Sequence, residues 1–294
     1  MTALRIVVFE ERYWSEVGPL YAELQLGASS VAGAWWDVAG YVAEDGGFWV
    51  ALWGETVVGY AGVAAVPGLI GVWEMVVGVA VGERLKGVGR ALVGQCRAWV
   101  GRQGGQALSV GLNEPVGVGM EIFLTKVGFE TEHDEVWLTH DLGGLPTVRW
   151  PAGVVGRRWD DEERVVAAFL AVYEASFGQW PWYQPYDEDE VVAGLDEPED
   201  ILFAVRGGEV VGMAWCQLNG KRGEIEPIGV VAAAEGLGIG RALTAEGLRW
   251  LAEAGAQRVD LGVWLTNKRA IGLYERLGFE RSGGRRYWRL GIEL

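Results

Sequence analysis

Two glycine-rich turns carry the most readily interpreted chemistry in this 294-residue sequence. The first runs from Arg84 to Gly89 and the second from Glu235 to Gly240, each after a predicted strand and before a predicted helix. Glycines at such a junction let main-chain N–H groups approach an anion, and the positive end of the helix favours negative charge. The spacing therefore predicts that the turns bind a pyrophosphate.

The two turns belong to an internal repeat with an offset of about half the chain. Three matches occur in the same order in both halves: Gly54–Gly59 with Gly208–Gly212, Lys86–Leu92 with Leu237–Leu243, and Gly128-Phe129 with Gly278-Phe279. Three ordered matches at nearly one offset favour duplication of a whole domain over chance. We therefore expect two copies of one fold.

The elements that must position these turns follow from periodicity. Glycines and prolines near 142–151 predict a boundary, which gives domains at 1–145 and 146–294. In the second half we expect strands at 148–158, 201–205, 210–218, 224–230, 259–265 and 286–292, and helices at 161–176, 187–195, 238–254 and 269–277. The first half repeats this order. The fold class is α/β, a mixed sheet flanked by helices in each of two tandem domains.

Composition narrows the possible partners. The net charge of −15 argues against nucleic acid and favours a cationic or amine-bearing small molecule, although acidity also keeps a protein soluble. No long uncharged apolar run or export signal is present, so we expect a cytoplasmic protein without a membrane partner. Two histidines and two scattered cysteines predict no metal site.

The sequence from Ile228 to Leu243, together with Asn267–Ala270 and Tyr274–Phe279, resembles the GNAT superfamily of N-acetyltransferases. The resemblance implies direct acetyl transfer from acetyl-CoA to an amine, without an acyl-enzyme. It also implies that the turn amides bind the pyrophosphate and that the strand before the turn pairs with the pantetheine arm. The implied cofactor-binding residues are Ile228, Gly229, Val230, Gly236, Leu237, Gly238, Ile239, Gly240, Arg241 and Asn267, with Arg84, Gly87, Val88, Gly89 and Arg90 in the first half.

The resemblance also implies two catalytic roles. Tyr274 occupies the place of the family's tyrosine that protonates the departing thiolate; the alternative is that its ring only packs under the sheet. Glu224 and Glu226 alternate on one face of the strand before the turn, and either could accept the amine's proton. Glu226 is favoured because it lies nearer the turn. The alternative is an ordinary pair of solvent-facing glutamates.

Each half departs from the family pattern. The first has Leu85 where a glycine is usual and Leu124 where the second half has Tyr274, so it lacks a proton donor. The second has Glu235 where arginine or glutamine is usual, and a carboxylate facing a pyrophosphate would repel it. We therefore expect a degenerate first domain and a catalytic second domain, with CoA affinity in question.

An aromatic segment followed by four acids predicts the acceptor site. Trp180, Trp182, Tyr183 and Tyr186 could hold a cationic amine through their ring faces, and Asp187–Glu190 could attract it. The alternatives are tryptophans that pack the two halves together and acids that begin a helix.

These features lead to one main hypothesis and several alternatives. The main one is an acetyltransferase acting on a primary amine of a small molecule or peptide, as a monomer or homodimer. A narrower version resembles mycothiol synthase, a tandem member of the superfamily that acetylates a cysteinyl pseudo-disaccharide. The alternatives are a non-catalytic CoA sensor and a scaffold with two decayed sites.

Overall fold

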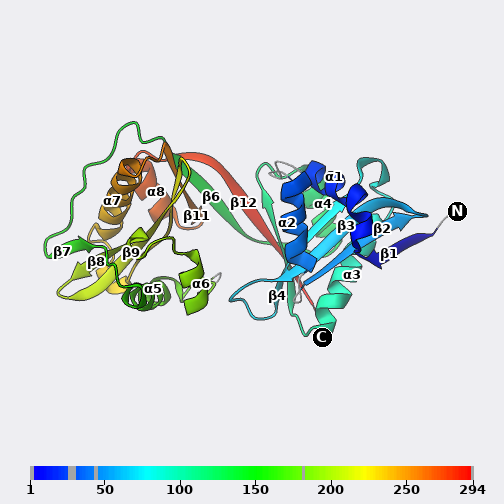
Figure 1. The fold of residues 1–294 in the computed structure, drawn as a ribbon, viewed down its shortest axis with the longest axis horizontal. Helices are drawn as coiled ribbons and strands as arrows, with labels where there is room; N and C mark the ends of the chain where they lie inside the picture. The colour runs from blue at the N-terminus through cyan, green and yellow to red at the C-terminus, as the bar shows by residue number, and fades with distance from the viewer. Residues whose placement is uncertain (1–2, 26–30, 43–45, 181–182, 293–294) are drawn as a thin grey trace. The chain divides into compact units, whose positions relative to one another are not determined.

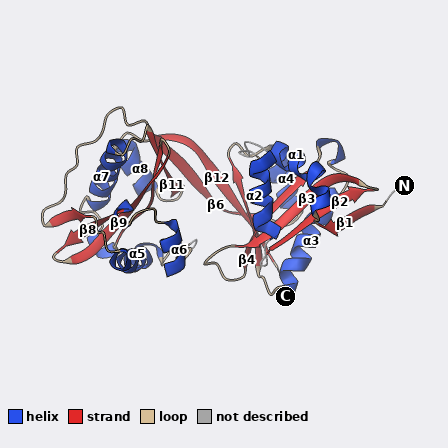
Figure 2. Ribbon diagram, viewed as in Figure 1, coloured by secondary structure: helices blue, strands red, loops and turns tan. Residues whose placement is uncertain are grey.

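A computed structural model describes residues 3–25, 31–42, 46–180 and 183–292. The chain divides into two compact units. Unit 1 comprises Met1–His133 with Arg286–Leu294, and unit 2 comprises Asp134–Arg285. Figures 1 and 2 show that each unit is a sheet flanked by helices. Among the described helices, none is long and apolar enough to cross a bilayer.

Unit 2 is built on a mixed sheet with helices on both faces. Its strands lie in the order β12-β6-β11-β10-β9-β8-β7. The elements, in chain order, are β6 (Glu130–His140), β7 (Val154–Arg157), α5 (Glu162–Phe177), α6 (Glu188–Gly194), β8 (Ile201–Arg206), β9 (Glu209–Asn219), β10 (Arg222–Val230), α7 (Ile239–Glu253), β11 (Arg258–Trp264), α8 (Lys268–Arg276) and β12 (Glu280–Gly291).

The two faces of this sheet bury different helices. The spacing of Leu243, Leu248 and Leu251 gives α7 one apolar face, which packs with α8 into a core cluster on the sheet. Val165 and Phe169 of α5 belong to a second cluster, which Met213 and Trp215 of β9 join. Figure 1 shows α7 and α8 on one side and α5 and α6 on the other.

Strands β10 and β11 separate where the site forms. They pair in parallel only from Arg222 with Arg258 to Glu224 with Asp260. Beyond that point β10 has a bulge, because Glu226 and Pro227 together oppose the single residue Trp215 of β9. The parting of two parallel strands leaves main-chain groups on both edges without a ladder partner. These groups are then available to a ligand or a side chain.

Unit 1 has the same element order, as the repeat predicted. Its strands lie in the order β1-β2-β3-β4-β5-β12-β6. The elements are β1 (Leu4–Val8), α1 (Trp14–Leu24), α2 (Val31–Val42), β2 (Gly46–Trp53), β3 (Thr56–Ala65), β4 (Val72–Val79), α3 (Val88–Arg102), β5 (Ala107–Asn113) and α4 (Val118–Lys126). The prediction of a duplicated α/β fold is confirmed.

The last strand of each repeat contributes to both units. Residues 134–140 of β6 belong to unit 2, where Glu135–His140 pair antiparallel with Val259–Trp264 of β11. Residues 286–291 of β12 belong to unit 1. The compact units therefore exchange strand segments relative to the sequence repeat. The division of the repeat itself at 145/146 stays a prediction.

Two predicted strands have different bounds in the structure. The strand expected at 148–158 is confined to Val154–Arg157, because Val154 N–H donates to the carbonyl of Pro151 in a turn at 3.0 Å. The closing strand begins at Glu280 rather than 286. Gly283 and Gly284 weaken the strand signal at its start, since glycine has low strand propensity.

Candidate functional site

A cavity of about 670 Å³ opens beside the glycine turn of unit 2. Its walls come from the end of α5, the end of β10, the turn, the start of α7, and α8. All predicted cofactor residues of the second half except Leu237 line it: Ile228, Gly229, Val230, Gly236, Gly238, Ile239, Gly240, Arg241 and Asn267. Leu237 is 45% exposed and stands outside the lining. The structure thus brings the predicted residues together around one cavity.

The turn has the backbone that its glycines predict. Gly236 and Gly238 have φ of +77° and +88°, a region that glycine enters without strain. Gly238 caps α7 without a side-chain hydrogen bond, so the first N–H groups of the helix are not satisfied by a cap. At Gly240 the nearest atom to an added Cβ would be 3.8 Å away. Nothing in the described residues fills the helix N-terminus.

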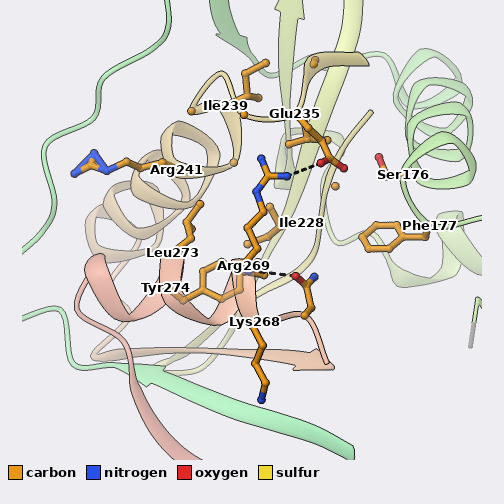
Figure 3. Close-up of a pocket in the computed structure, with 18 of the residues that line it drawn as sticks. Ser176, Phe177, Ile228, Glu235, Ile239, Arg241, Lys268, Arg269, Leu273 and Tyr274 are labelled. Atoms are coloured by element: carbon orange, nitrogen blue, oxygen red, sulfur yellow. Dashed lines mark hydrogen bonds and ion pairs between the residues drawn. The ribbon is translucent and has the colours of Figure 1, made fainter. Parts of the chain in front are cut away.

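The cavity is basic although the chain is acidic. Arg241, Lys268, Arg269 and Arg276 line it, against one carboxylate, Glu235. That carboxylate lies 2.6 Å from the guanidinium of Arg269, which reaches across from α8 (Figure 3). The repulsion expected of Glu235 is therefore offset by an ion pair that the sequence did not predict. The lining favours a polyanionic ligand.

Tyr274 lines the same cavity from α8 (Figure 3). It is 8% exposed, and its ring packs against Phe279 at 5.8 Å between centroids. Among the described residues its hydroxyl has no hydrogen-bond partner. Burial, and then the nearby Glu226 carboxylate, raise the pKa of Tyr274 above its ordinary value. The phenol is therefore protonated at neutral pH, as a proton donor must be.

Glu226 lies at the bulge and reaches across the gap between the strands. Its Oε2 accepts a hydrogen bond from the N–H of Gly262 on β11 at 3.0 Å. The Glu226 side chain is exposed at its surface, yet desolvation, followed by the carboxylates of Glu135 and Glu224, raises its pKa to about 7. The Gly262 N–H opposes that rise. A base whose pKa lies near neutrality suits removal of a proton from an amine.

Aromatic residues gather near Glu226. Tyr173 of α5 packs against Tyr183 and Tyr186, with ring centroids 5.6 and 4.9 Å away. The pKa of Tyr186 is raised by burial and then by Glu226, which places that phenol near the carboxylate. Trp180, which lines the cavity, packs against Trp264 at 5.3 Å. Trp182 lies outside the described residues.

The acids after this segment begin a helix. The Asp187 side chain accepts from the N–H of Glu190 at 2.8 Å, and the Glu190 side chain accepts from the N–H of Asp187 at 3.0 Å. This reciprocal capping box starts α6. The structural alternative for the acids is thus confirmed for these two residues.

The corresponding turn of unit 1 keeps its shape. Leu85 and Gly87 have φ of +63° and +88°, close to those of Gly236 and Gly238. Val88 is buried in the core, whereas Arg84 and Arg90 are exposed. The Nε of Arg84 donates to the carbonyl of Val79 at 3.2 Å. The loop conformation therefore does not distinguish the two halves.

The side chains around the turn of unit 1 differ from those of unit 2. Phe123 of α4 approaches within 3.1 Å of an added Cβ on Gly89. Leu124, at the position of Tyr274, is fully buried in the core. Strand β4 has no bulge, and the residue at the matching place is the apolar Val76. Unit 1 therefore has apolar residues at the places of Glu226 and Tyr274, whereas Glu74 pairs with β5 as Glu224 pairs with β11 and so occupies the place of Glu224.

Comparison with known proteins defines the class. The sequence profile of the acetyltransferase (GNAT) family matches residues 10–129 and 160–279. This chain belongs to that family and is a tandem N-acetyltransferase with one matched segment in each repeat. The described residues contain no group of three His, Cys, Asp or Glu side chains placed to hold a metal ion.

Particular relatives are similar over different lengths. The chain is 31% identical to the mycothiol acetyltransferase of Pseudarthrobacter chlorophenolicus over 78% of this chain and 72% of that protein. The mycothiol acetyltransferase of Streptomyces bingchenggensis is 36% identical over 46% of each chain. A GCN5-related N-acetyltransferase from Sphaerobacter thermophilus has the same fold, with a TM-score of 0.77 at 19% identity, covering 99% of this chain and 96% of that one.

Two residues near the site, Arg269 and Glu135, were not predicted from the sequence. Arg269 stands within the matched Asn267–Ala270 segment, but no sequence rule pairs it with Glu235, which lies 34 residues earlier. Glu135 comes from the first repeat, and only the strand exchange brings it beside Glu226. Glu235 stands where the family has arginine or glutamine, and this departure was the sequence feature that could have predicted a neighbouring cation.

Proposed function

We propose that unit 2 transfers the acetyl group of acetyl-CoA directly to a primary amine of a small molecule or peptide in the cytoplasm. The observation that carries the proposal is that one cavity joins an uncapped helix N-terminus, a basic lining and the protonated phenol of Tyr274. The pyrophosphate would be held by the N–H groups of Gly236–Arg241, with Arg241 and Lys268 adding positive charge. The pantetheine arm would pair with the freed edge of Ile228–Val230.

Proton transfer would use Tyr274, which lines the cavity, and Glu226, which lies on β10 and bonds to Gly262 across the gap between the strands. Glu226 accepts a proton from the acceptor ammonium, which leaves a neutral amine. As the amine nitrogen bonds to the thioester carbon, the carbon–sulfur bond breaks and Tyr274 protonates the sulfur. The nitrogen then releases its remaining extra proton, which restores the Tyr274 phenol, and Glu226 returns its own proton to solvent. The products are an amide and free CoA. Glu224 lies on the same strand, and its carboxylate raises the pKa of Glu226, so it tunes Glu226 rather than replacing it.

Unit 1 has no proton donor at the position of Tyr274 and no acceptor at the position of Glu226, so we assign it no transfer chemistry. Val76 and Leu124 are both apolar, and Phe123 lies against Gly89. Whether it binds CoA is a separate property, which depends on main-chain amides alone.

The experiment is a measurement of acetylated product by mass spectrometry, with acetyl-CoA and a panel of amines. A cysteinyl sugar conjugate belongs in the panel, because the similarity to proteins named mycothiol acetyltransferase over most of this chain favours that acceptor as the narrower proposal. Mass detection is preferred to a thiol reagent, since such an acceptor carries its own thiol. CoA binding by calorimetry without turnover for any amine would favour the sensor alternative, and no binding would favour the scaffold.

A further inference from the structure

One hydroxyl in the wall of the cavity has no partner within the described part of the chain. Ser176, in the last turn of α5, lines the cavity, and its Oγ is buried without a hydrogen bond to any described residue. A helical serine or threonine can bond the carbonyl four residues earlier, as Thr244 does with Gly240 at 2.8 Å. Ser176 makes no such bond. A buried hydroxyl without a partner costs free energy, so a ligand that accepted its hydrogen bond would recover that cost.

The hydroxyl lies directly over β10, beside the cavity. An added Cβ on Gly229 would lie 3.0 Å from the Oγ of Ser176 and 3.0 Å from the ring of Phe177. The lack of a side chain at residue 229 therefore lets α5 lie close to β10. Figure 3 shows Ser176 and Phe177 on the α5 wall, across the cavity from Leu273 and Tyr274 of α8.

The place of this contact on β10 indicates which part of CoA the hydroxyl would meet. The N–H of Val231 donates to the carbonyl of Val211 on β9 at 3.1 Å, and peptide groups alternate sides along a strand. The main-chain groups of Ile228 and Val230 therefore point toward the gap, where the pantetheine arm would pair. Gly229 stands between them, so the hydroxyl faces the arm rather than the diphosphate. The polar groups along the middle of the arm are amides, whose carbonyl oxygens accept hydrogen bonds from hydroxyls.

The matching place in unit 1 has a hydroxyl with a protein partner. Gly78 of β4 corresponds to Gly229, because each lies nine residues before the helix-capping glycine of its repeat. An added Cβ on Gly78 would lie 2.6 Å from the hydroxyl of Tyr60, which accepts a hydrogen bond from Nε2 of Gln25 at 3.0 Å. Both repeats thus place a hydroxyl over the same glycine. That of unit 1 is satisfied within the fold, whereas that of unit 2 lies at the cavity without a partner among the described residues.

We propose that Ser176 is a cofactor-binding residue, whose hydroxyl donates a hydrogen bond to an amide carbonyl of the pantetheine arm. The inference rests on the proposed function of unit 2, from which it takes CoA as the ligand. It adds a contact from α5 to those of β10 and the glycine turn. The site then distinguishes CoA from a nucleotide that carries the same diphosphate but no arm.

The test is calorimetry on the full chain with Ser176→Ala, using CoA and 3′-phospho-ADP, which is CoA without its arm. We expect Kd for CoA to rise about fivefold, the effect of losing one neutral hydrogen bond, and Kd for 3′-phospho-ADP to stay unchanged. Tyr60→Phe is the matched control, since it removes the corresponding hydroxyl of unit 1 and should change neither Kd. An equal loss for both ligands, or no loss for CoA, would overturn the proposal.

Thermal melting of the free proteins separates a ligand contact from a structural role. Ser176→Ala removes a hydroxyl that has no partner among the described residues, so its melting temperature should not fall below that of wild type. Tyr60→Phe loses the bond from Gln25 and should melt at a lower temperature. A lower melting temperature for Ser176→Ala would mean that the hydroxyl stabilises the fold, and the proposal would be wrong.

The remaining outcomes distinguish this inference from the proposed function. Acetyl-CoA is titrated in parallel, and a loss of affinity for acetyl-CoA with CoA unaffected would move the contact to the acetyl carbonyl and overturn its assignment to the arm. Wild-type protein that binds CoA without acetylating any amine would refute the proposed transfer, and the two Kd values would still decide the role of Ser176. Wild-type protein that binds no CoA would overturn both.

Discussion

The Glu235 carboxylate and the Arg269 guanidinium form an ion pair 2.6 Å long at the edge of the glycine turn. Both side chains are about half exposed, so the pair adds little to folding stability. Its value lies in charge at the binding site. The family usually has arginine or glutamine at position 235, and here a neutral ion pair takes its place. The net positive charge of the cavity then comes from Arg241, Lys268 and Arg276.

Removal of Arg269 should therefore weaken CoA binding. In Arg269→Ala the Glu235 carboxylate faces the ligand alone, and we expect Kd for CoA to rise about tenfold, the effect of about 1.4 kcal/mol. The double variant Glu235→Gln with Arg269→Ala should recover part of that loss, since it removes the repulsion. Calorimetry on both variants gives the answer. A double variant as weak as the single one would mean that Arg269 acts by direct contact only.

The two glycine turns offer a matched test of which unit binds CoA. Gly238 and Gly87 both have φ of +88° and no atom within 4 Å of an added Cβ. Alanine at either position should cost about 1 kcal/mol of backbone strain. We expect Gly238→Ala to weaken CoA binding at least fivefold and Gly87→Ala to leave the strongest site unchanged. Thermal melting checks that the two variants are equally destabilised, and the reverse pattern in calorimetry would move the site to unit 1.

Tyr274→Phe should separate chemistry from binding. The ring is 8% exposed and keeps its packing against Phe279, so the fold should be retained. Loss of the hydroxyl removes the proton donor to sulfur, and kcat should fall at least about tenfold with CoA affinity unchanged. Stopped assays for acetylated product, with calorimetry for CoA, measure the two quantities. An unchanged kcat would remove Tyr274 from the mechanism.

Glu226 should set the pH dependence. Its carboxylate is the base, and its pKa of about 7 predicts that kcat/KM rises with pH up to that value and then levels. Glu226→Gln should lose this rise, together with about 100-fold or more of the activity. A profile that keeps its rise in the variant would assign the ionisation to another group.

The same shift predicts the pH dependence of stability. Because folding raises the pKa of Glu226 from 4.5 to about 7, the folded state binds more protons than the unfolded chain between these values. Its contribution to stability is therefore present at low pH and lost as pH rises through 7. We expect the melting temperature of Glu226→Gln, relative to wild type, to increase from pH 5 to pH 8. A difference that stays constant across this range would contradict the raised pKa.

Much of the fold could be predicted from the sequence because its signals are local. The glycines of Glu235–Gly240 predict a left-handed backbone and the start of a helix, and the matching turn in the first repeat supports the same prediction. The helical spacing of residues 269–277 predicted a helix directly after β11 and placed Tyr274 on that helix. These are effects of a few neighbouring residues, which a single sequence contains in full.

The tertiary structure decided the relations between distant residues. Whether Glu235 repels a ligand depends on Arg269, and the pKa of Glu226 depends on a bulge, on the parting of two strands and on Glu135 from the other repeat. Strand exchange follows from the neighbouring places of β12 and β6 in the sheet, which no local pattern records. Charge interactions act through space over a few ångströms, so the sequence determined which groups exist and the fold alone determined which of them meet.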